Sequence, residues 1–145
     1  MSKAIAENRR ARFDYEIEET LEAGIVLTGP EIKAVRAGKV NLSGSYGRIF
    51  AHQGKAEIWL VGSNIAVLEG DASRSRKLLL NRKEINGMIG KVQEKGKTLL
   101  PLKMYLTRGR AKIELGIGVG RKKHDKRNVI KDREISRELR QKRMR

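Results

Sequence analysis

Residues 99–119, LLPLKMYLTRGRAKIELGIGV, decide the fold that this sequence predicts. Two apolar segments, Leu99–Leu106 and Lys112–Val119, flank the turn signal Arg108-Gly109, which is typical of a β-hairpin. We expect this hairpin to close the fold, with Gly116 and Gly118 belonging to a flexible strand end that leads out of it.

More strands are predicted upstream of this hairpin. Tyr46–Phe50 and Glu57–Val61 form a second hairpin around His52-Gln53-Gly54-Lys55. Phe13–Ile17 alternates apolar and acidic residues, which indicates a half-buried strand. Ala23–Leu27 is a further apolar segment, and Leu78-Leu79-Leu80 is a short buried one.

Two helices are predicted between these strands. Thr28 and Glu31 have capping-box spacing around Pro30, so a helix should cover Pro30–Ala37 and stop at Gly38. Asn81, with Glu84 three residues later, predicts a second helix over Arg82–Val92. Strands dominate, so we predict a mostly β fold with inserted helices: a small closed β-barrel of the oligonucleotide-binding type. Aromatic residues make up only 4% of the chain, so its core should be aliphatic.

The charge divides the 145 residues into two parts. We expect a barrel over residues 1–120, with residues 1–8 as a loose arm, and a basic tail over residues 121–145. The tail carries 12 Lys or Arg against 4 acids, which is half of the net charge of +16. Its like charges repel one another, so we expect it to be disordered alone and to order on a polyanion. A solvated charged helix or a solubility tail is the alternative.

Nucleic acid is the partner that this charge favours. The apolar segments are far too short to span a bilayer, and the apolar residues of the tail are too loosely spaced for a membrane-surface helix, so no membrane partner is predicted. The chain has no cysteine, and its first ten residues, MSKAIAENRR, contain no apolar signal segment. We therefore expect a cytoplasmic protein.

Basic residues also occur in three separate segments of the predicted barrel. On a small barrel they could converge into one phosphate-binding face, or they could be scattered over the surface. They are Arg9, Arg10, Arg12, Lys33, Arg36, Lys39, Arg74, Arg76 and Lys77.

No catalytic, metal or cofactor site is predicted. His52 and His124 each stand alone, without metal-ligand spacing or a Ser-His-Asp pattern. Gly90 and Gly96-Lys97-Thr98 resemble a phosphate-binding loop, but the spacing of the glycines is wrong. His124 lies among basic residues, where it could stack on a nucleobase or be a plain surface histidine.

Several short segments together resemble one family, small protein B, the bacterial partner of transfer-messenger RNA. The segments occur in the family's order and cover most of the chain. They are Glu7–Tyr15, Ile17–Gly29, Glu31–Leu42, Arg76–Leu80, Thr98–Tyr105 and Gly120–Arg127, continuing into Lys131-Asp132-Arg133. One departure is the short stretch Ala66–Ser73, where the family usually has a longer segment.

The resemblance implies a barrel that grips the tRNA-like end of transfer-messenger RNA and helps to rescue ribosomes stalled on messages without a stop codon. It implies RNA contacts by Asn8, Arg9, Arg10, Glu22, Ala23, Gly24, Lys33, Arg36 and Lys39. It also implies that the tail folds as a helix in the empty mRNA channel, against small-subunit RNA. The tail residues expected to act there are His124, Asp125, Lys126, Arg127, Lys131 and Arg133, with Arg137 and Arg140 on the same side of the helix.

We therefore predict a non-enzymatic RNA-binding adaptor that acts as a monomer when bound. A general ribosomal or RNA-chaperone protein with the same barrel is the alternative.

Overall fold

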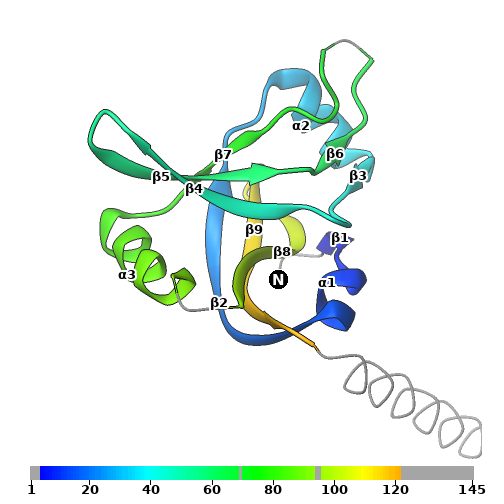
Figure 1. The fold of residues 1–145 in the computed structure, drawn as a ribbon. Coiled ribbons are helices and arrows are strands. Elements are labelled where there is room, and N and C mark those ends of the chain that lie inside the picture. The colour runs from blue at the N-terminus through cyan, green and yellow to red at the C-terminus, as the bar shows by residue number, and fades with distance from the viewer. Residues whose placement is uncertain (1–3, 69, 94–95, 122–145) are drawn as a thin grey trace, which may run out of the picture.

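The computed structural model describes residues 4–68, 70–93 and 96–121 (Figure 1). The tail residues beyond Arg121 lie outside this range. The predicted ribosome contacts that fall there are His124, Asp125, Lys126, Arg127, Lys131, Arg133, Arg137 and Arg140.

Nine strands and three helices form the described body. The strands are β1 (Ala4–Glu7), β2 (Tyr15–Ile25), β3 (Val40–Asn41), β4 (Tyr46–His52), β5 (Lys55–Val61), β6 (Asn64–Ile65), β7 (Arg76–Leu79), β8 (Lys97–Thr107) and β9 (Arg110–Gly120). The helices are α1 (Arg9–Asp14), α2 (Gly29–Arg36) and α3 (Arg82–Val92).

Seven of the strands make one antiparallel sheet in the order β1-β8-β4-β5-β7-β2-β9. Because β9 also pairs with β8, the six strands from β8 to β9 form a ring (Figure 1). β3 and β6 form a separate two-stranded sheet. The prediction of a mostly β fold with inserted helices is confirmed.

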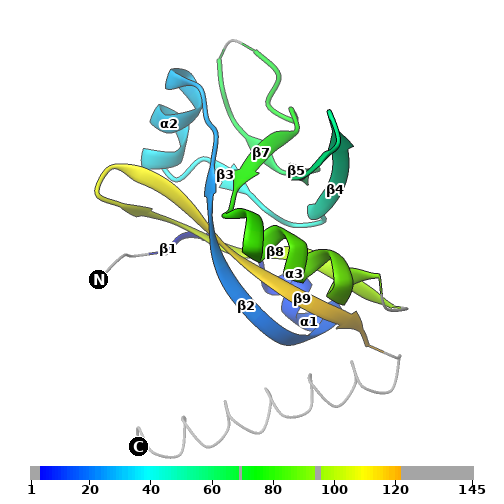
Figure 2. The same ribbon diagram turned by 90° about the vertical axis from the view of Figure 1, so that its left-hand side faces the viewer.

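Aliphatic side chains and methionine fill the interior of the ring, as predicted from the low aromatic content. Ile58, Leu60, Leu99, Met104 and Ile113 are completely buried there. α3 adds Ile85 and Met88 to this core, and α2 adds Ala34 and Val35. The two helices lie toward opposite ends of the body (Figures 1 and 2).

Both predicted hairpins are present, and their turns explain why. In the β8–β9 turn, Arg108 and Gly109 have φ values of 52° and 78°, and in the β4–β5 turn Gln53 and Gly54 have values of 49° and 76°. Two consecutive positive φ angles match the right-handed twist of the flanking strands. The turn residues therefore set the register of both hairpins.

Both predicted helices are also confirmed, because their capping signals are local. Thr28 and Glu31 form a reciprocal capping box at the start of α2, and Asn81 and Glu84 form another at the start of α3. α2 occupies Gly29–Arg36 rather than Pro30–Ala37, and Gly38 follows it with φ of 75°.

Helix α1 was not predicted, and the expected strand over Phe13–Ile17 is wrong for its first two residues. The side chain of Asn8 caps α1 by accepting a hydrogen bond from the Ala11 amide. Its amide nitrogen donates to the Leu42 and Pro101 carbonyls, at 3.2 and 2.8 Å. Contacts with distant residues therefore fix the start of this helix, and the local alternation does not reveal them.

The loose arm predicted for residues 1–8 is corrected for residues 4–7, which form β1. Ala4 pairs with Tyr105, Ala6 with Met104 and Glu7 with Lys103 on β8. Among the residues that the structure describes, β4 pairs with β8 only between Gly47 and Leu99, so the rest of that edge of β8 would have unpaired backbone groups. β1 satisfies part of this edge.

Gly116 and Gly118 are packing positions rather than a flexible strand end. A Cβ atom on Gly116 would lie 2.8 Å from Leu102 Cδ1, and one on Gly118 would lie 2.9 Å from Tyr15 Cβ. The two glycines thus let the side chains of β2 and β8 close over β9. Ala11 of α1 completes this second, smaller core on the outside of the ring.

Candidate nucleic-acid interface

The outer surface of the ring carries a line of four residues from four neighbouring strands. Gly24 on β2 is paired with Lys112 on one side and Leu79 on the other, and Lys112 is paired with Tyr105 on β8. Their strand neighbours Met104, Ile113, Ala23 and Leu78 are buried at 1% exposure or less, so the line itself faces outward. We call Tyr105, Lys112, Gly24 and Leu79 the outer row.

The outer row has apolar surface next to positive charge. Leu79 is 51% exposed and Val26 is 44% exposed, so both offer apolar surface to a ligand. With Gly24, Arg110 and Lys112 they line a shallow hollow of about 420 Å³. Among the described residues, no carboxylate pairs with Lys112 or Arg110. Both cations are therefore available to an anionic ligand.

A second line of residues lies beside the outer row, and an acidic residue in it holds two cations in place. Glu114 is paired with Lys103 and with Glu22 across the strands. Its carboxylate binds Arg12 at 3.3 Å and Lys103 at 3.4 Å. Arg12 reaches this position from α1, so helix and sheet contribute to one surface.

Tyr105 donates a hydrogen bond from its hydroxyl to the Glu22 carboxylate. Burial and this contact with Glu22 raise the pKa of Tyr105 above its ordinary value. The hydroxyl therefore remains a hydrogen-bond donor even in alkaline solution, and its bond to Glu22 holds the ring in one orientation. Lys103 Nζ lies 6.0 Å from the centroid of that ring.

This surface fits RNA better than it fits a small ligand. Aliphatic and aromatic side chains can pack against a ribose or base, while neighbouring cations bind phosphate. The shallow shape of the hollow does not enclose a ligand as a cofactor pocket does. Gly24 leaves the space beside Leu79 free of a side chain. A Cβ at position 24 would lie 3.3 Å from Leu79 Cβ.

The structure places the predicted contacts of residues 22–24 on two sides of the strand. Glu22 and Gly24 belong to the outer surface, whereas Ala23 is only 1% exposed and faces the core. Ala23 therefore supports the surface from below.

The predicted basic segments on α1 and α2 do not form one patch. α1 comes directly before β2 and α2 follows it, and both views place them at opposite ends of this strand (Figures 1 and 2). Arg9, Arg10, Lys33, Arg36 and Lys39 are all exposed. The outer row crosses this strand at Gly24, and the two groups of basic residues lie beyond the two ends of the strand.

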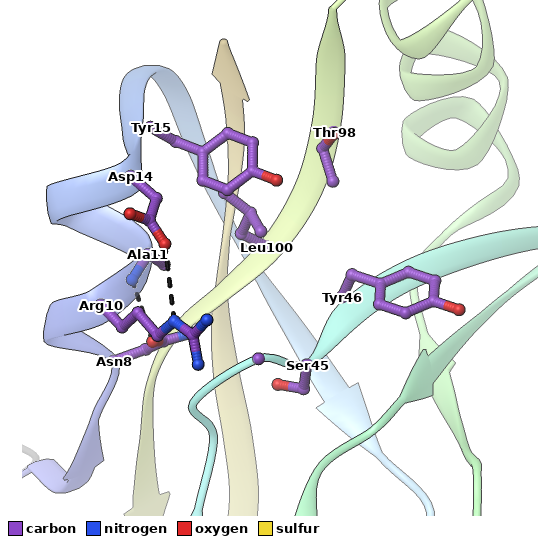
Figure 3. Close-up of a pocket in the computed structure, with 10 residues that line it drawn as sticks. Asn8, Arg10, Ala11, Asp14, Tyr15, Ser45, Tyr46, Thr98 and Leu100 are labelled. Carbon is purple, nitrogen blue, oxygen red and sulfur yellow. Dashed lines mark hydrogen bonds and ion pairs between the residues drawn. The ribbon is translucent and has the colours of Figure 1, made fainter. Parts of the chain in front are cut away.

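Asn8 and Arg10 lie at a small pocket between α1 and the start of β4 (Figure 3). Arg10 Nε is 3.5 Å from Asp14 Oδ2. Asn8 is 2% exposed, and its side-chain oxygen and nitrogen are both hydrogen-bonded within the protein. Asn8 thus positions α1, with its arginines, and presents no free polar atom to a ligand.

Arg76 does not belong to an exposed basic patch, because its side chain is completely buried. Its guanidinium pairs with Glu31, and Arg74 binds the same carboxylate. Burial tends to raise the pKa of Glu31, but hydrogen bonds from Arg74, the Thr28 backbone and Arg76 outweigh it and lower the pKa to about 2. Lys77 is half-buried and lies 3.2 Å from Glu57.

Comparison with known proteins identifies the family. The family model for "SmpB protein" matches residues 5–145. The chain belongs to the SmpB family.

Curated relatives in the SmpB family are similar in sequence to this chain over almost its whole length. The SsrA-binding protein of Desulfitobacterium hafniense is 50% identical over 143 residues, covering 94% of this chain and 89% of that protein. The SsrA-binding protein of Chloroflexus aggregans is 52% identical over 142 residues, with coverages of 93% and 87%. That of Thermosynechococcus vestitus is 48% identical over 144 residues, with coverages of 94% and 92%.

A solved structure supports the fold. It comes from work described as "tmRNA-SmpB: a journey to the center of the bacterial ribosome". The match has a TM-score of 0.66 and 49% identity, and it covers 81% of this chain and 85% of the other.

Several residues of the SmpB body that shape the outer surface were missed from the sequence: Val26, Leu79, Lys103, Tyr105, Arg110 and Lys112. A signal for four of them exists in the closing hairpin. Lys103 and Tyr105 on one strand, and Arg110 and Lys112 on the other, occupy alternate positions between apolar residues. Such alternation indicates a polar outward face.

The residues that the structure describes contain no group of three or more His, Cys, Asp or Glu side chains that could hold a metal ion. None of their helices is both long and apolar enough to cross a bilayer.

Proposed function

We propose that this protein binds the tRNA-like domain of transfer-messenger RNA and delivers it to ribosomes stalled on messages that lack a stop codon. The observation that carries the proposal is the SmpB match over residues 5–145, which includes body and tail. Relatives at about 50% identity are SsrA-binding proteins, and SsrA is transfer-messenger RNA. The solved neighbour associates tmRNA-SmpB with the bacterial ribosome.

The outer row is the part of the body that we assign to the tRNA-like domain. Leu79 and Val26 offer apolar surface to a ribose or base, and Lys112 and Arg110 lie within reach of the phosphates beside it. Arg12, held by Glu114, extends this surface toward α1. Such contacts recognise the shape and backbone of a structured RNA and need no base-edge code.

Basic residues at both ends of β2 would strengthen this binding. Arg9 and Arg10 on α1 flank one end, and Lys33, Arg36 and Lys39 flank the other. Each phosphate that they neutralise releases counterions, so the affinity should depend on salt.

We infer that the ring is a closed barrel of the oligonucleotide-binding type, formed by residues 1–120. The six-strand ring and its aliphatic interior support this assignment. Residues 121–145 would then act as a separate basic segment. We expect the protein to work as a monomer when bound.

For the tail we propose a helix in the empty mRNA channel, against small-subunit RNA. Its high charge would delay folding until the RNA walls of the channel neutralise it. His124, Asp125, Lys126 and Arg127 would then lie near the decoding centre, where His124 stacks on a base and the two cations bind phosphate.

The protein would thus be an adaptor rather than an enzyme, and it would act in the cytoplasm with the ribosome. Its contribution is to bind and to position RNA, which requires no catalytic group or cofactor. The alternative is a general ribosomal or RNA-chaperone protein with the same barrel.

Recovery of RNA from a cell extract with the full-length protein separates the two functions. One dominant species with a tRNA-like acceptor end supports the adaptor. A mixture of ribosomal RNA fragments without that species contradicts it and favours the general RNA-binding protein.

A further inference from the structure

Glu114 is an acidic residue in the middle of the surface that we assign to RNA. Its strand neighbours Ile113 and Leu115 are completely buried, so Glu114 lies on the outward side of β9. Lys112 of the outer row is two residues away on the same side, which corresponds to about 7 Å along a strand. The Glu114 side chain is 24% exposed, so its charge lies near any phosphate bound at Lys112. By charge alone, an acid at this position should repel RNA.

The stability of the sheet does not explain this carboxylate. Glu114 is paired directly with Glu22 on β2, and like charges opposite each other destabilise a sheet. Its ion pairs with Arg12 and Lys103 are partly exposed, and pairs of this kind contribute little to stability. The role of Glu114 is therefore to be sought in what its two cations do.

The contact with Arg12 is not needed to hold helix α1 on the sheet. At the start of α1, the buried side chain of Asn8 makes three hydrogen bonds within the protein. At its end, the Asp14 carbonyl accepts a hydrogen bond from the Arg121 amide. Because both ends of the helix are fixed in this way, the contact with Glu114 fixes only the Arg12 side chain.

One carboxylate thus holds two cations that come from different elements. Glu114 Oε1 lies 3.3 Å from Arg12 Nη2 on α1, and Oε2 lies 3.4 Å from Lys103 Nζ on β8. Within the described residues, neither cation binds another carboxylate. An arginine has five N–H donors and a lysine has three, so both cations keep donors for a phosphate while Glu114 holds them.

A cation that is already held costs less to bind. Long side chains such as Arg and Lys lose rotamer freedom when they bind a ligand, and this loss weakens the affinity. We propose that Glu114 is a positioning residue, which fixes Arg12 and Lys103 before RNA arrives and so strengthens RNA binding although its own charge repels phosphate. The tRNA-like domain as the ligand rests on the proposed function, whereas the fixing of the two cations does not.

Glu114→Gln in the full-length protein tests this role, because glutamine has nearly the same shape without the charge. Removal of a repulsive charge alone would tighten binding of the tRNA-like domain. Loss of positioning should instead weaken it about fivefold. The salt slope should also become smaller by about 1, because the released cations contact phosphate less often. Filter binding at several salt concentrations measures both, and unchanged or tighter binding overturns the proposal.

The background in which both cations are absent should reverse the sign of the effect. In a protein with Arg12→Gln and Lys103→Gln, only the repulsion by Glu114 remains, so adding Glu114→Gln should tighten binding. Further weakening would show that Glu114 does not act through these cations. Glu19→Gln is the matched control, because Glu19 on β2 pairs with Lys91 of α3 at 2.6 Å. It removes the same charge from another ion pair and should not weaken binding.

Two measurements on the free protein separate positioning from a structural role. Nitrogen-15 relaxation of the Arg12 side chain should show a lower order parameter at Nε in Glu114→Gln than in the wild type. The urea midpoint should stay the same or rise, because the repulsion between Glu114 and Glu22 is removed. An unchanged order parameter overturns the proposal. A lower urea midpoint would make Glu114 a structural residue and also overturn it.

If the wild-type protein does not bind the tRNA-like domain at all, the function proposed above fails. The relaxation measurement still decides whether Glu114 fixes Arg12.

Discussion

Arg76 on β7 and Glu31 on α2 form an ion pair inside the protein, although 45 positions separate them in the sequence. Arg76 Nε lies 2.6 Å from Glu31 Oε2, and the side chains are 0% and 3% exposed. The remaining guanidinium nitrogens donate to Ser63 and to the Ala72 carbonyl. This network ties α2 to the sheet and to the segment before β7.

Replacing Glu31 by Gln should destabilise the protein by about 3–5 kcal/mol, because it leaves the Arg76 guanidinium buried without a counter-charge. Glutamine can still serve in the capping box, so the loss reports on the charge. Urea unfolding measures the effect. Glu84→Gln is the matched control, since Glu84 has the same capping position on α3 but lies near the surface. Equal, small losses for both variants would contradict the prediction.

Acid should destabilise the protein through the same carboxylate. The pKa of Glu31 falls from an ordinary 4.5 to about 2 in the folded state, so the ionised form favours folding. This stabilisation, roughly 3 kcal/mol, is fully present above about pH 5 and is lost as the pH falls through about 2. The difference in unfolding free energy between the wild type and Glu31→Gln should therefore shrink over that range. A constant difference would mean that Glu31 keeps an ordinary pKa.

Replacing Lys112 by Gln should weaken binding of the tRNA-like domain roughly tenfold and reduce the salt slope by about 1, because one phosphate contact is lost. Filter binding at several salt concentrations measures both quantities. Lys83→Gln on α3 is the control and should change neither. An unchanged slope for Lys112→Gln would remove Lys112 from the interface.

Ending the chain after Arg121 should leave the affinity for the tRNA-like domain within about tenfold, or roughly 1.4 kcal/mol. The outer row and α1 stay intact, since the Arg121 amide, which donates to the Asp14 carbonyl, is retained. The shortened protein should nevertheless fail to support the rescue of stalled ribosomes by transfer-messenger RNA. A loss of several orders of magnitude in affinity would show that the tail is itself a main RNA contact.

The sequence predicted the secondary-structure elements whose ends are fixed by residues close to one another in the chain. The capping boxes at Thr28 and Asn81 fixed the starts of α2 and α3, and Arg108-Gly109 fixed the turn of the closing hairpin. Each of these signals spans four residues or fewer, so it needs no contact with distant residues. The resemblance to the small protein B family, confirmed by the SmpB match, came from short segments of the same kind.

Only the tertiary structure decided which polar residues are available to RNA. The Asn8 amide and the Arg76 guanidinium could both bind RNA if they were exposed. Both side chains are buried, and they bind the Pro101 carbonyl and the Glu31 carboxylate instead. The outer row depends on strand pairing between residues 24, 79, 105 and 112. The sequence by itself thus determined α2, α3, the two hairpins and the family, because their signals are local, whereas α1 depends on contacts of Asn8 with distant residues. Register and burial decided the surface, because they depend on contacts between residues that are far apart in the chain.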